Sequence, residues 1–179
     1  MELSLFIVVG SIALVVVGIL FIFMIMGLLA GLPYVPTNWE KIEKIIALSR
    51  VQPHEKVVDL GSGDGRILIE FAKAGIEVHG YEINPFLVWY SRRNIKARGL
   101  EGKAFVHYKN FWKQDLSSYD IIVIYGIGYI MKRLEEKLAI ELKPGARVIS
   151  SAFEFPTWKA VSVSNGLFLY DGTGTILSK

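Results

Sequence analysis

An acid and three glycines follow a short apolar run in the first half of the chain. Asp59 ends the run, and Gly61, Gly63 and Gly65 come after it at alternate positions. A strand that leads through a glycine turn into a helix points backbone N–H groups at a bound ligand. A dinucleotide site needs the spacing G-x-G-x-x-G, and Arg66 stands where its third glycine would fall. The spacing therefore favours a ligand that has an amino-acid end in place of a pyrophosphate.

This loop resembles the S-adenosylmethionine (SAM) loop of seven-strand methyltransferases. Asp59 is placed to accept hydrogen bonds from the ligand ammonium, directly or through water. Asp64 either does the same or caps the helix that follows. The residues expected to bind SAM in this segment are Asp59, Gly61, Ser62, Gly63, Asp64 and Gly65.

A second acid stands about 20 residues beyond the glycine loop, which is the spacing of a ribose-binding carboxylate. Glu82 ends a strand-like segment in Tyr81-Glu82-Ile83-Asn84-Pro85. At this place it is expected to accept hydrogen bonds from the ribose hydroxyls. The alternative is that Glu82 caps the next helix, for which Pro85 is a usual first residue.

Polar and aromatic residues follow the next two strand-like segments. Asn110 with Phe111 or Trp112 suits an adenine ring by hydrogen bonding and stacking, and the alternative is that the rings belong to the core. Tyr125 and Tyr129 follow the fourth strand, at the edge where ligands bind in open α/β sheets. Methyl transfer needs a positioned and desolvated nucleophile, and these hydroxyls are candidates to align it. The alternative for both tyrosines is ordinary packing.

The elements that carry these residues alternate between strands and helices. Such alternation predicts a mostly parallel sheet with right-handed crossovers, and two final strands without a helix between them predict an antiparallel hairpin. The predicted class is α/β, a seven-strand Rossmann-like methyltransferase sheet with a C-terminal hairpin. Helices are predicted over 38–50, 66–74, 85–98 and 132–142, and strands over 56–59, 77–81, 104–107, 119–125, 147–152, 161–163, 167–170 and 175–177.

The N-terminal segment is apolar enough to cross a membrane. Residues 3–39 carry no charged side chain, and 3–32 is almost unbroken apolar sequence. About 20 apolar residues are enough to span a bilayer, so this run is long enough. We predict a transmembrane anchor in 1–32 and a methyltransferase domain in 33–179. The alternative, a cleaved signal peptide, expects a basic start and a shorter apolar run. Lys41, Lys44 and Arg50 follow the span, which places the domain on the cytoplasmic face by the positive-inside rule.

Composition narrows the function classes further. Residues 33–179 hold all 20 Lys and Arg and 16 of the 17 Asp and Glu, a net charge of +4. This modest excess suits a domain near anionic headgroups, and it lacks the dense basic run that nucleic-acid binding requires. The chain has no cysteine, which excludes disulfides and thiolate chemistry. His54, His79 and His107 are widely spaced, so no metal site is predicted.

Together these features resemble one family, the membrane-anchored seven-strand lysine methyltransferases whose mitochondrial members modify the ADP/ATP translocase and the c subunit of ATP synthase. The most specific segments are Pro33-Tyr34-Val35-Pro36-Thr37 and Phe153-Glu154-Phe155-Pro156 with Trp158. The resemblance implies that Tyr34, Pro36 and Thr37 fold over the SAM site and help to bind SAM. Thr37 is also predicted to begin a capping box with Glu40. An Arg-rich transit peptide is missing, which favours a prokaryotic member of the family.

The sequence therefore predicts a SAM-dependent methyltransferase. The resemblance implies that it is a protein-lysine N-methyltransferase acting on a membrane-associated protein, and a tether raises the effective concentration of such substrates. Two alternatives remain open at this point. One is a methyltransferase of a lipid or small amphiphile, and the other is a non-catalytic membrane-tethered SAM sensor.

Overall fold

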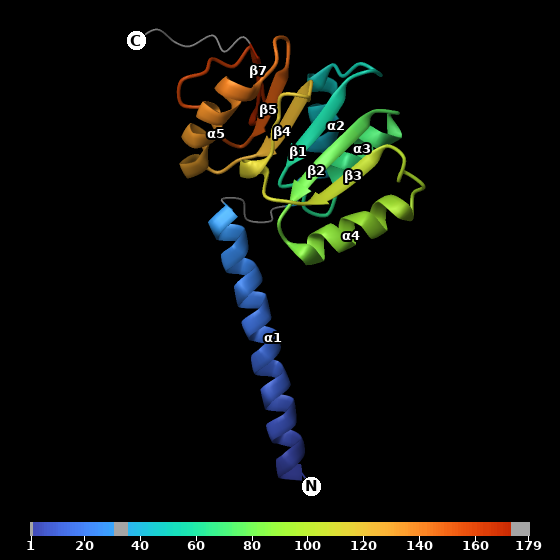
Figure 1. Ribbon diagram of the computed structural model, residues 1–179, viewed down its shortest axis with the longest axis vertical. Coiled ribbons are helices and arrows are strands. Elements are labelled where there is room, and N and C mark those ends of the chain that lie inside the picture. The colour runs from blue at the N-terminus through green and yellow to red at the C-terminus, as the bar shows by residue number, and fades with distance from the viewer. Residues whose placement is uncertain (1, 31–35, 173–179) are drawn as a thin grey trace.

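The computed structural model describes residues 2–30 and 36–172, which form one N-terminal helix followed by an α/β domain (Figure 1). The helices are α1 (Glu2–Ala30), α2 (Trp39–Ser49), α3 (Arg66–Lys73), α4 (Pro85–Lys96), the 3-10 helix η1 (Phe111–Lys113) and α5 (Gly128–Glu141). The strands are β1 (Lys56–Leu60), β2 (Glu77–Glu82), β3 (Ala104–Tyr108), β4 (Ile121–Tyr125), β5 (Arg147–Ser151), β6 (Ser162–Ser164) and β7 (Leu167–Asp171).

The seven strands form one sheet in the order β3-β2-β1-β4-β5-β7-β6. β1 to β5 pair in parallel, and β7 pairs antiparallel with both β5 and β6. The strand order changes direction between β1 and β4, which is where open α/β sheets bind ligands at the carboxyl ends of their strands. The predicted α/β class with a C-terminal antiparallel hairpin is confirmed.

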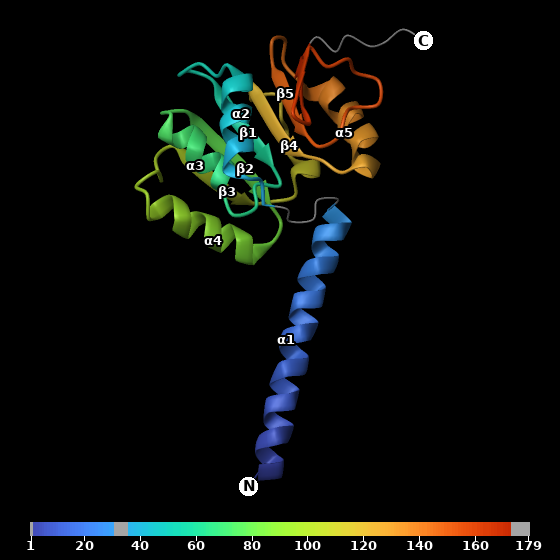
Figure 2. The ribbon, with the colours of Figure 1, turned by 180° about the vertical axis from the view of Figure 1, so that it is seen from behind.

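Helices cover both faces of the sheet, which explains why its strands are apolar almost throughout. Neighbouring residues of β1 point to opposite faces of the sheet. Val57 is buried in one cluster with Ile42 of α2 and residues of α3, and Val58 is buried in the other with Leu134 of α5. Figure 2 shows α2 and α3 in front of the sheet, on the face opposite the one that α5 covers. The domain thus has three layers, with the sheet between two layers of helices.

Two local predictions need correction, the capping box at Thr37 and the start of α5. Asn38, not Thr37, is the N-cap of α2, because its Oδ1 accepts a hydrogen bond from the Lys41 amide at 2.9 Å. The expected partner Glu40 instead pairs with Lys44 one turn along the helix. α5 begins at Gly128, earlier than the predicted residue 132, because its first turn forms through the glycine-containing segment that suggested a loop. The predicted strand at 175–177 lies outside the described residues.

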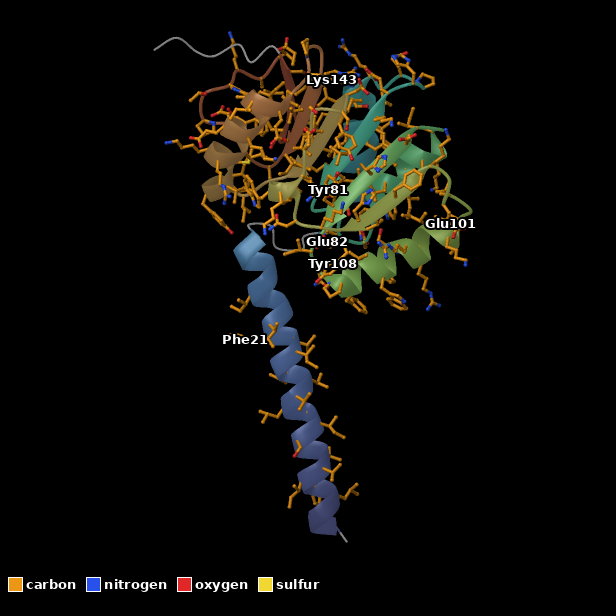
Figure 3. All side chains as sticks on the ribbon, in the orientation of Figure 1. Phe21, Tyr81, Glu82, Glu101, Tyr108 and Lys143 are labelled. Carbon is orange, nitrogen blue, oxygen red and sulfur yellow. The ribbon has the colours of Figure 1, made fainter. Side chains whose placement is uncertain are left out.

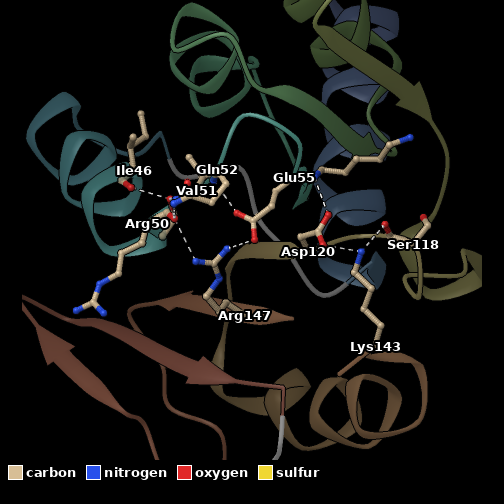
Figure 4. A network of polar contacts seen from close by, with 11 residues as sticks. Ile46, Arg50, Val51, Gln52, Glu55, Ser118, Asp120, Lys143 and Arg147 are labelled. Carbon is tan, nitrogen blue, oxygen red and sulfur yellow. Dashed lines mark hydrogen bonds and ion pairs between the residues drawn. The ribbon is translucent and has the colours of Figure 1, made fainter. Parts of the chain in front are cut away.

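A network of polar contacts lies at the N-terminal ends of the parallel strands, where β1 and β5 begin (Figure 4). Arg147 pairs with Glu55 and donates from Nη1 to the Arg50 carbonyl at the end of α2. Asp120 accepts from the Lys56 amide and pairs with Lys143. These contacts join segments far apart in sequence. They therefore hold together the end of the domain opposite the carboxyl ends of the parallel strands.

α1 stands apart from this packing. Its Leu5–Ile22 window has a mean hydropathy of 3.1, and none of that window is buried. By length and composition it is able to cross a membrane.

Candidate functional site

The candidate site lies at the edge where the parallel strands end. β1 leads into the glycine loop, β2 ends at Glu82, β3 ends at Tyr108 and β4 ends at Tyr125. Figure 3 shows Glu82 and Tyr108 at the edge of the domain nearer α1, whereas Lys143 lies at the opposite edge. The topology therefore brings the predicted site residues of several segments to one side of the molecule.

The loop requires glycine for two reasons: its backbone angles are positive, and a neighbouring side chain leaves no room for a Cβ atom. Gly61, Gly63 and Gly65 have φ angles of 86°, 55° and 81°, which other residues rarely adopt. The amides of Gly61 and Ser62 both donate to the Tyr81 carbonyl, at 2.9 and 3.1 Å. A Cβ on Gly65 would lie 2.0 Å from Ser91 Oγ. The loop is therefore held against the end of β2 and the side of α4.

Glu82 is the residue that connects this loop to the second strand. Its side chain is buried, and its Oε2 accepts from the Gly63 amide at 2.9 Å. Its Oε1 accepts from the amides of Ile83 and Asn84 at 2.7 and 2.8 Å. Asn84, and not Glu82, caps α4, so the capping alternative for Glu82 is wrong. An ionised carboxylate has about four acceptor positions, and the three amides leave capacity for a ligand hydroxyl.

Asp59 is also buried, 3% exposed, but its surroundings differ from those of Glu82. Burial raises the pKa of Asp59 to about 8, and the nearby carboxylates of Glu82 and Asp64 act in the same direction. A buried acid beside other acids is stabilised in its charged form by a cation. The site is thus electrostatically suited to a positively charged ligand.

Asp64 has a role that neither predicted alternative anticipated. Its carboxylate accepts from Arg66 Nε at 2.9 Å and from Nη2 at 2.6 Å, while its contact with the Arg66 amide is long, at 3.4 Å. Arg66 Nη1 also donates to the Thr37 carbonyl at 2.7 Å. The Arg66 guanidinium lies 5.5 Å from the ring centroid of Trp39. Arg66 therefore joins the glycine loop to the start of α2. From the sequence alone, Arg66 serves only to exclude a dinucleotide site.

The segment before α2 lies partly within the described residues. Tyr34 lies outside them, Pro36 is exposed and Thr37 is buried, 7% exposed. The Thr37–Arg66 contact puts Thr37 against the glycine loop. A SAM contact by Tyr34, Pro36 or Thr37 stays a prediction.

The residues after β3 are tightly packed. Asn110 Oδ1 accepts from the Trp112 amide at 3.0 Å and caps η1. Phe111 is buried in the α5-side core, and Trp112 is half-buried with the Arg133 guanidinium 4.4 Å from its ring centroid. The core alternative thus describes the Phe111 ring well, and adenine binding by Asn110 and Phe111 stays a prediction.

The two candidate catalytic tyrosines lie in different settings. Tyr125 is half-buried at the end of β4, and Lys41 Nζ lies 5.5 Å from its ring centroid. Burial lowers the pKa of Lys41. Tyr129 is on the first turn of α5 and is 66% exposed. Lys41 is a neighbour of the site that no sequence pattern indicated, because only the packing of α2 brings it to Tyr125.

Two of the three histidines lie together away from this site. His79 Nδ1 and His107 Nε2 are 3.0 Å apart on neighbouring strands, and Glu77 Oε1 lies 3.2 Å from His79 Nε2. Burial and the charge of His79 lower the pKa of His107. Within 2–30 and 36–172 there is no cluster of three or more His, Cys, Asp or Glu side chains able to hold a metal ion.

Comparison with known proteins gives concordant matches. The model of the ANTKMT methyltransferase domain matches residues 59–162. The mouse lysine N-methyltransferase of the ATP synthase c subunit is 43% identical over 129 residues, which is 71% of this chain and 51% of the mouse protein. A protein-lysine N-methyltransferase of Saccharolobus islandicus is 34% identical over 140 residues, covering 77% of this chain and 87% of the archaeal protein.

A solved structure matches over a similar span. The RNA methyltransferase from Salinibacter ruber, in complex with S-adenosyl-L-homocysteine, has a TM-score of 0.71 and 29% identity, and the match covers 76% of this chain and 91% of that one. The chain spans about half the length of several curated relatives that it matches, such as the mouse enzyme.

Proposed function

The chain belongs to the ANTKMT methyltransferase family, and from that premise we propose that it transfers the methyl group of SAM to lysine ε-amines of a membrane-associated protein. The resemblance found in the sequence and the family match agree on this class of enzyme. The RNA acceptor named for the Salinibacter ruber enzyme belongs to a more distant relative, at 29% identity, than the lysine methyltransferase of mouse at 43%.

The observation that carries the proposal is the buried acid pair at the strand ends. SAM has an ammonium and a sulfonium group, and Asp59 lies buried beside the carboxylates of Glu82 and Asp64. This concentration of negative charge suits a cationic ligand. The residues of this chain therefore fit SAM.

The residues divide the work of binding and positioning. Asp59 would hold the ammonium of SAM, Glu82 the ribose hydroxyls and Asn110 the adenine, while the glycine loop gives the backbone access. When bound, SAM supplies an electrophilic methyl carbon on a positive sulfur. The lysine nitrogen must arrive with a free electron pair, and it loses one proton in the complete reaction. Tyr125 at the end of β4 and Tyr129 on the first turn of α5 would orient that nitrogen and exclude water.

We also propose that α1 spans a membrane, with the domain on the cytoplasmic side. Its long exposed apolar surface supports the span, and the basic residues that follow it support the orientation. A tethered enzyme meets membrane-embedded lysines at a raised effective concentration, so the anchor and the proposed substrate class agree.

The test is transfer of labelled methyl groups to membranes. Full-length protein is incubated with methyl-labelled SAM and membranes from cells that lack it, and the products are separated into lipid and protein. We expect methyl-lysine in hydrolysed protein, and much less of it with the variant Asp59→Asn when SAM is limiting. Label in the lipid fraction alone would identify a small amphiphilic acceptor. SAM binding without any transfer would identify a sensor.

A further inference from the structure

The exposed aromatic side chains of the α/β domain lie together at the edge where the parallel strands end. Within residues 36–172 they number seven, and they are between 39% and 66% exposed. Most lie at the end of a strand, in the segment just after it or in the first turn of a helix, and Trp89 and Tyr90 lie further along, in the middle of α4. They are Trp39, Phe86, Trp89, Tyr90, Tyr108, Tyr129 and Phe153.

α4 carries the densest part of this set. The Phe86 ring centroid lies 5.8 Å from that of Trp89 and 6.3 Å from that of Tyr90. The Arg93 guanidinium lies 5.7 Å from the Trp89 ring, so the row extends along the spacing i, i+3, i+4 and i+7. The opposite face of α4 packs on the sheet through residues such as Val88. The helix therefore has an outward apolar stripe in addition to its core face.

The length of the chain brings this edge close to the end of α1. α1 ends at Ala30, and Thr37 is hydrogen-bonded to Arg66 of the glycine loop. Seven extended residues reach at most about 25 Å. Figures 1 and 2 show α1 on the side of the domain where β2 ends and α4 begins. A bilayer that contains α1 therefore has its surface near the aromatic edge.

The chemistry of the edge matches a lipid surface. Trp and Tyr are enriched where membranes meet water, because their rings are apolar and their N–H and O–H groups are polar. Exposed basic side chains accompany these rings and complement anionic headgroups: Arg93 lies over Trp89, Arg133 lies over Trp112, and Lys109 follows Tyr108. We propose that this edge, with the α4 stripe at its β3 end, rests on the anionic lipid surface beside α1, an inference that depends on the proposed membrane anchor.

The consequence concerns which lysines are modified. An edge that lies on the lipid surface holds the end of β4, where the acceptor is proposed to bind, at the level of the headgroups. Lysines at the membrane–water boundary then reach the site, whereas lysines far out in soluble domains do not. The aromatic edge thereby acts as a selector of acceptor depth.

The test uses the absence of cysteine, which allows single nitroxide labels on the full-length chain. Labels are placed at Tyr90→Cys on the stripe, at Ile140→Cys on the last turn of α5 as an exposed control, and at Val16→Cys inside α1. The proteins are reconstituted in phosphatidylcholine vesicles with and without phosphatidylglycerol. Collision with oxygen, which concentrates in lipid, is compared with collision with a water-soluble nickel chelate.

We expect the label at position 90 to lose access to the nickel chelate several-fold in the anionic vesicles while it keeps access to oxygen. The label at 140 stays open to the chelate. Equal access of the chelate to labels 90 and 140 would overturn the proposal. Loss of access for both oxygen and the chelate at 90 would also overturn it, because it would show that protein and not lipid covers this position. A water-exposed label at 16 would show that the anchor itself fails. Transfer of methyl label, measured on the same samples, tests the enzymatic function separately.

Discussion

Two acids at the strand ends occupy different surroundings that suit different tasks. Glu82 accepts three backbone N–H groups, which stabilise its charge and hold the glycine loop on β2. Asp59 lies deeper beside like charges, and its pKa is raised to about 8. Glu82, which already accepts hydrogen bonds from the backbone, is suited to neutral hydroxyl donors. Asp59, which lies beside other acids, is suited to the ammonium group of the ligand.

The variant Glu82→Gln tests the ribose assignment. The amide keeps the size of the side chain, but its NH₂ group would face a backbone N–H and the negative charge is lost. Hydrogen bonds to charged groups contribute about 1.5–3 kcal/mol, so we expect SAM affinity to fall about tenfold to a hundredfold by calorimetric titration. Glu154→Gln, an exposed acid beyond β5, is the matched control. Unchanged affinity in Glu82→Gln with an unchanged melting temperature would refute the assignment.

Asp59 predicts a pH dependence of SAM binding. Because the pKa of the carboxyl group is raised to about 8 in the folded protein, the protonated form predominates below that pH. Binding of a cation to the ionised form then releases a proton, so affinity should rise with pH between about 6 and 7.5, by up to about tenfold per unit. Titrations in buffers of different ionisation enthalpy count the released proton. Asp59→Asn should bind weakly with little pH dependence, and an equally steep profile in this variant would contradict the assignment.

At the scale of elements, the glycine loop is constrained by packing as well as by backbone angle. Gly65→Ala adds a Cβ 2.0 Å from Ser91 Oγ at φ +81°, whereas Gly75→Ala has a similar φ of +83° and no atom within 4 Å. The angle alone costs about 1–2 kcal/mol, and overpacking adds about 1–3 kcal/mol. We expect Gly65→Ala to lower the free energy of unfolding more than Gly75→Ala, and Gly65→Ala/Ser91→Ala to recover part of the difference, because Ser91 Cβ would still lie 3.1 Å from the added methyl group. Equal losses in the two single variants would show that the contact with α4 is unimportant.

The polar network at the opposite edge makes a second prediction at this scale. Arg147→Gln removes the partner of Glu55 and a donor to the Arg50 carbonyl. The pair is mostly buried, with side-chain exposures of 20% and 14%. We expect a loss of about 1–3 kcal/mol in thermal unfolding of the full chain in detergent. Arg98→Gln, an exposed residue that donates to Asn94, should change stability by less than about 0.5 kcal/mol. A similar small effect for Arg147→Gln would show that the network does not stabilise the edge.

The sequence predicted most elements because apolar runs, glycines and prolines mark their limits. Its errors arose where tertiary contacts decide between local options. Asn38 and Thr37 are both good caps, and the choice between them depends on the contact of the Thr37 carbonyl with Arg66. The site residues on β1 and β2 could be predicted because an acid and glycine pattern has a fixed spacing. Lys41 and the His79–His107 pair could not, because only folding brings them to their neighbours.

At the scale of the whole molecule, the short connection between α1 and the domain should control access to membrane lysines. Insertion of about 20 Gly/Ser residues after residue 32, before the Pro33–Thr37 segment, would lengthen the reach and lower the effective concentration of the site at the bilayer surface. We expect slower transfer to membrane proteins and unchanged SAM affinity. The same insert placed after residue 179 is the control. Equal transfer rates for the two insertions would show that the tether length has no role.

The measurement that tests the central claim most directly is a residue-by-residue map of lysine methylation in membrane proteins. Membranes from cells with and without the intact chain, and with the Asp59→Asn variant, are compared by mass spectrometry. We predict methyl-lysines that require the intact chain and that lie at the membrane–water boundary of their proteins. The absence of any dependent methyl-lysine would contradict lysine transfer, and dependent sites confined to soluble proteins would contradict the membrane-tethered mechanism.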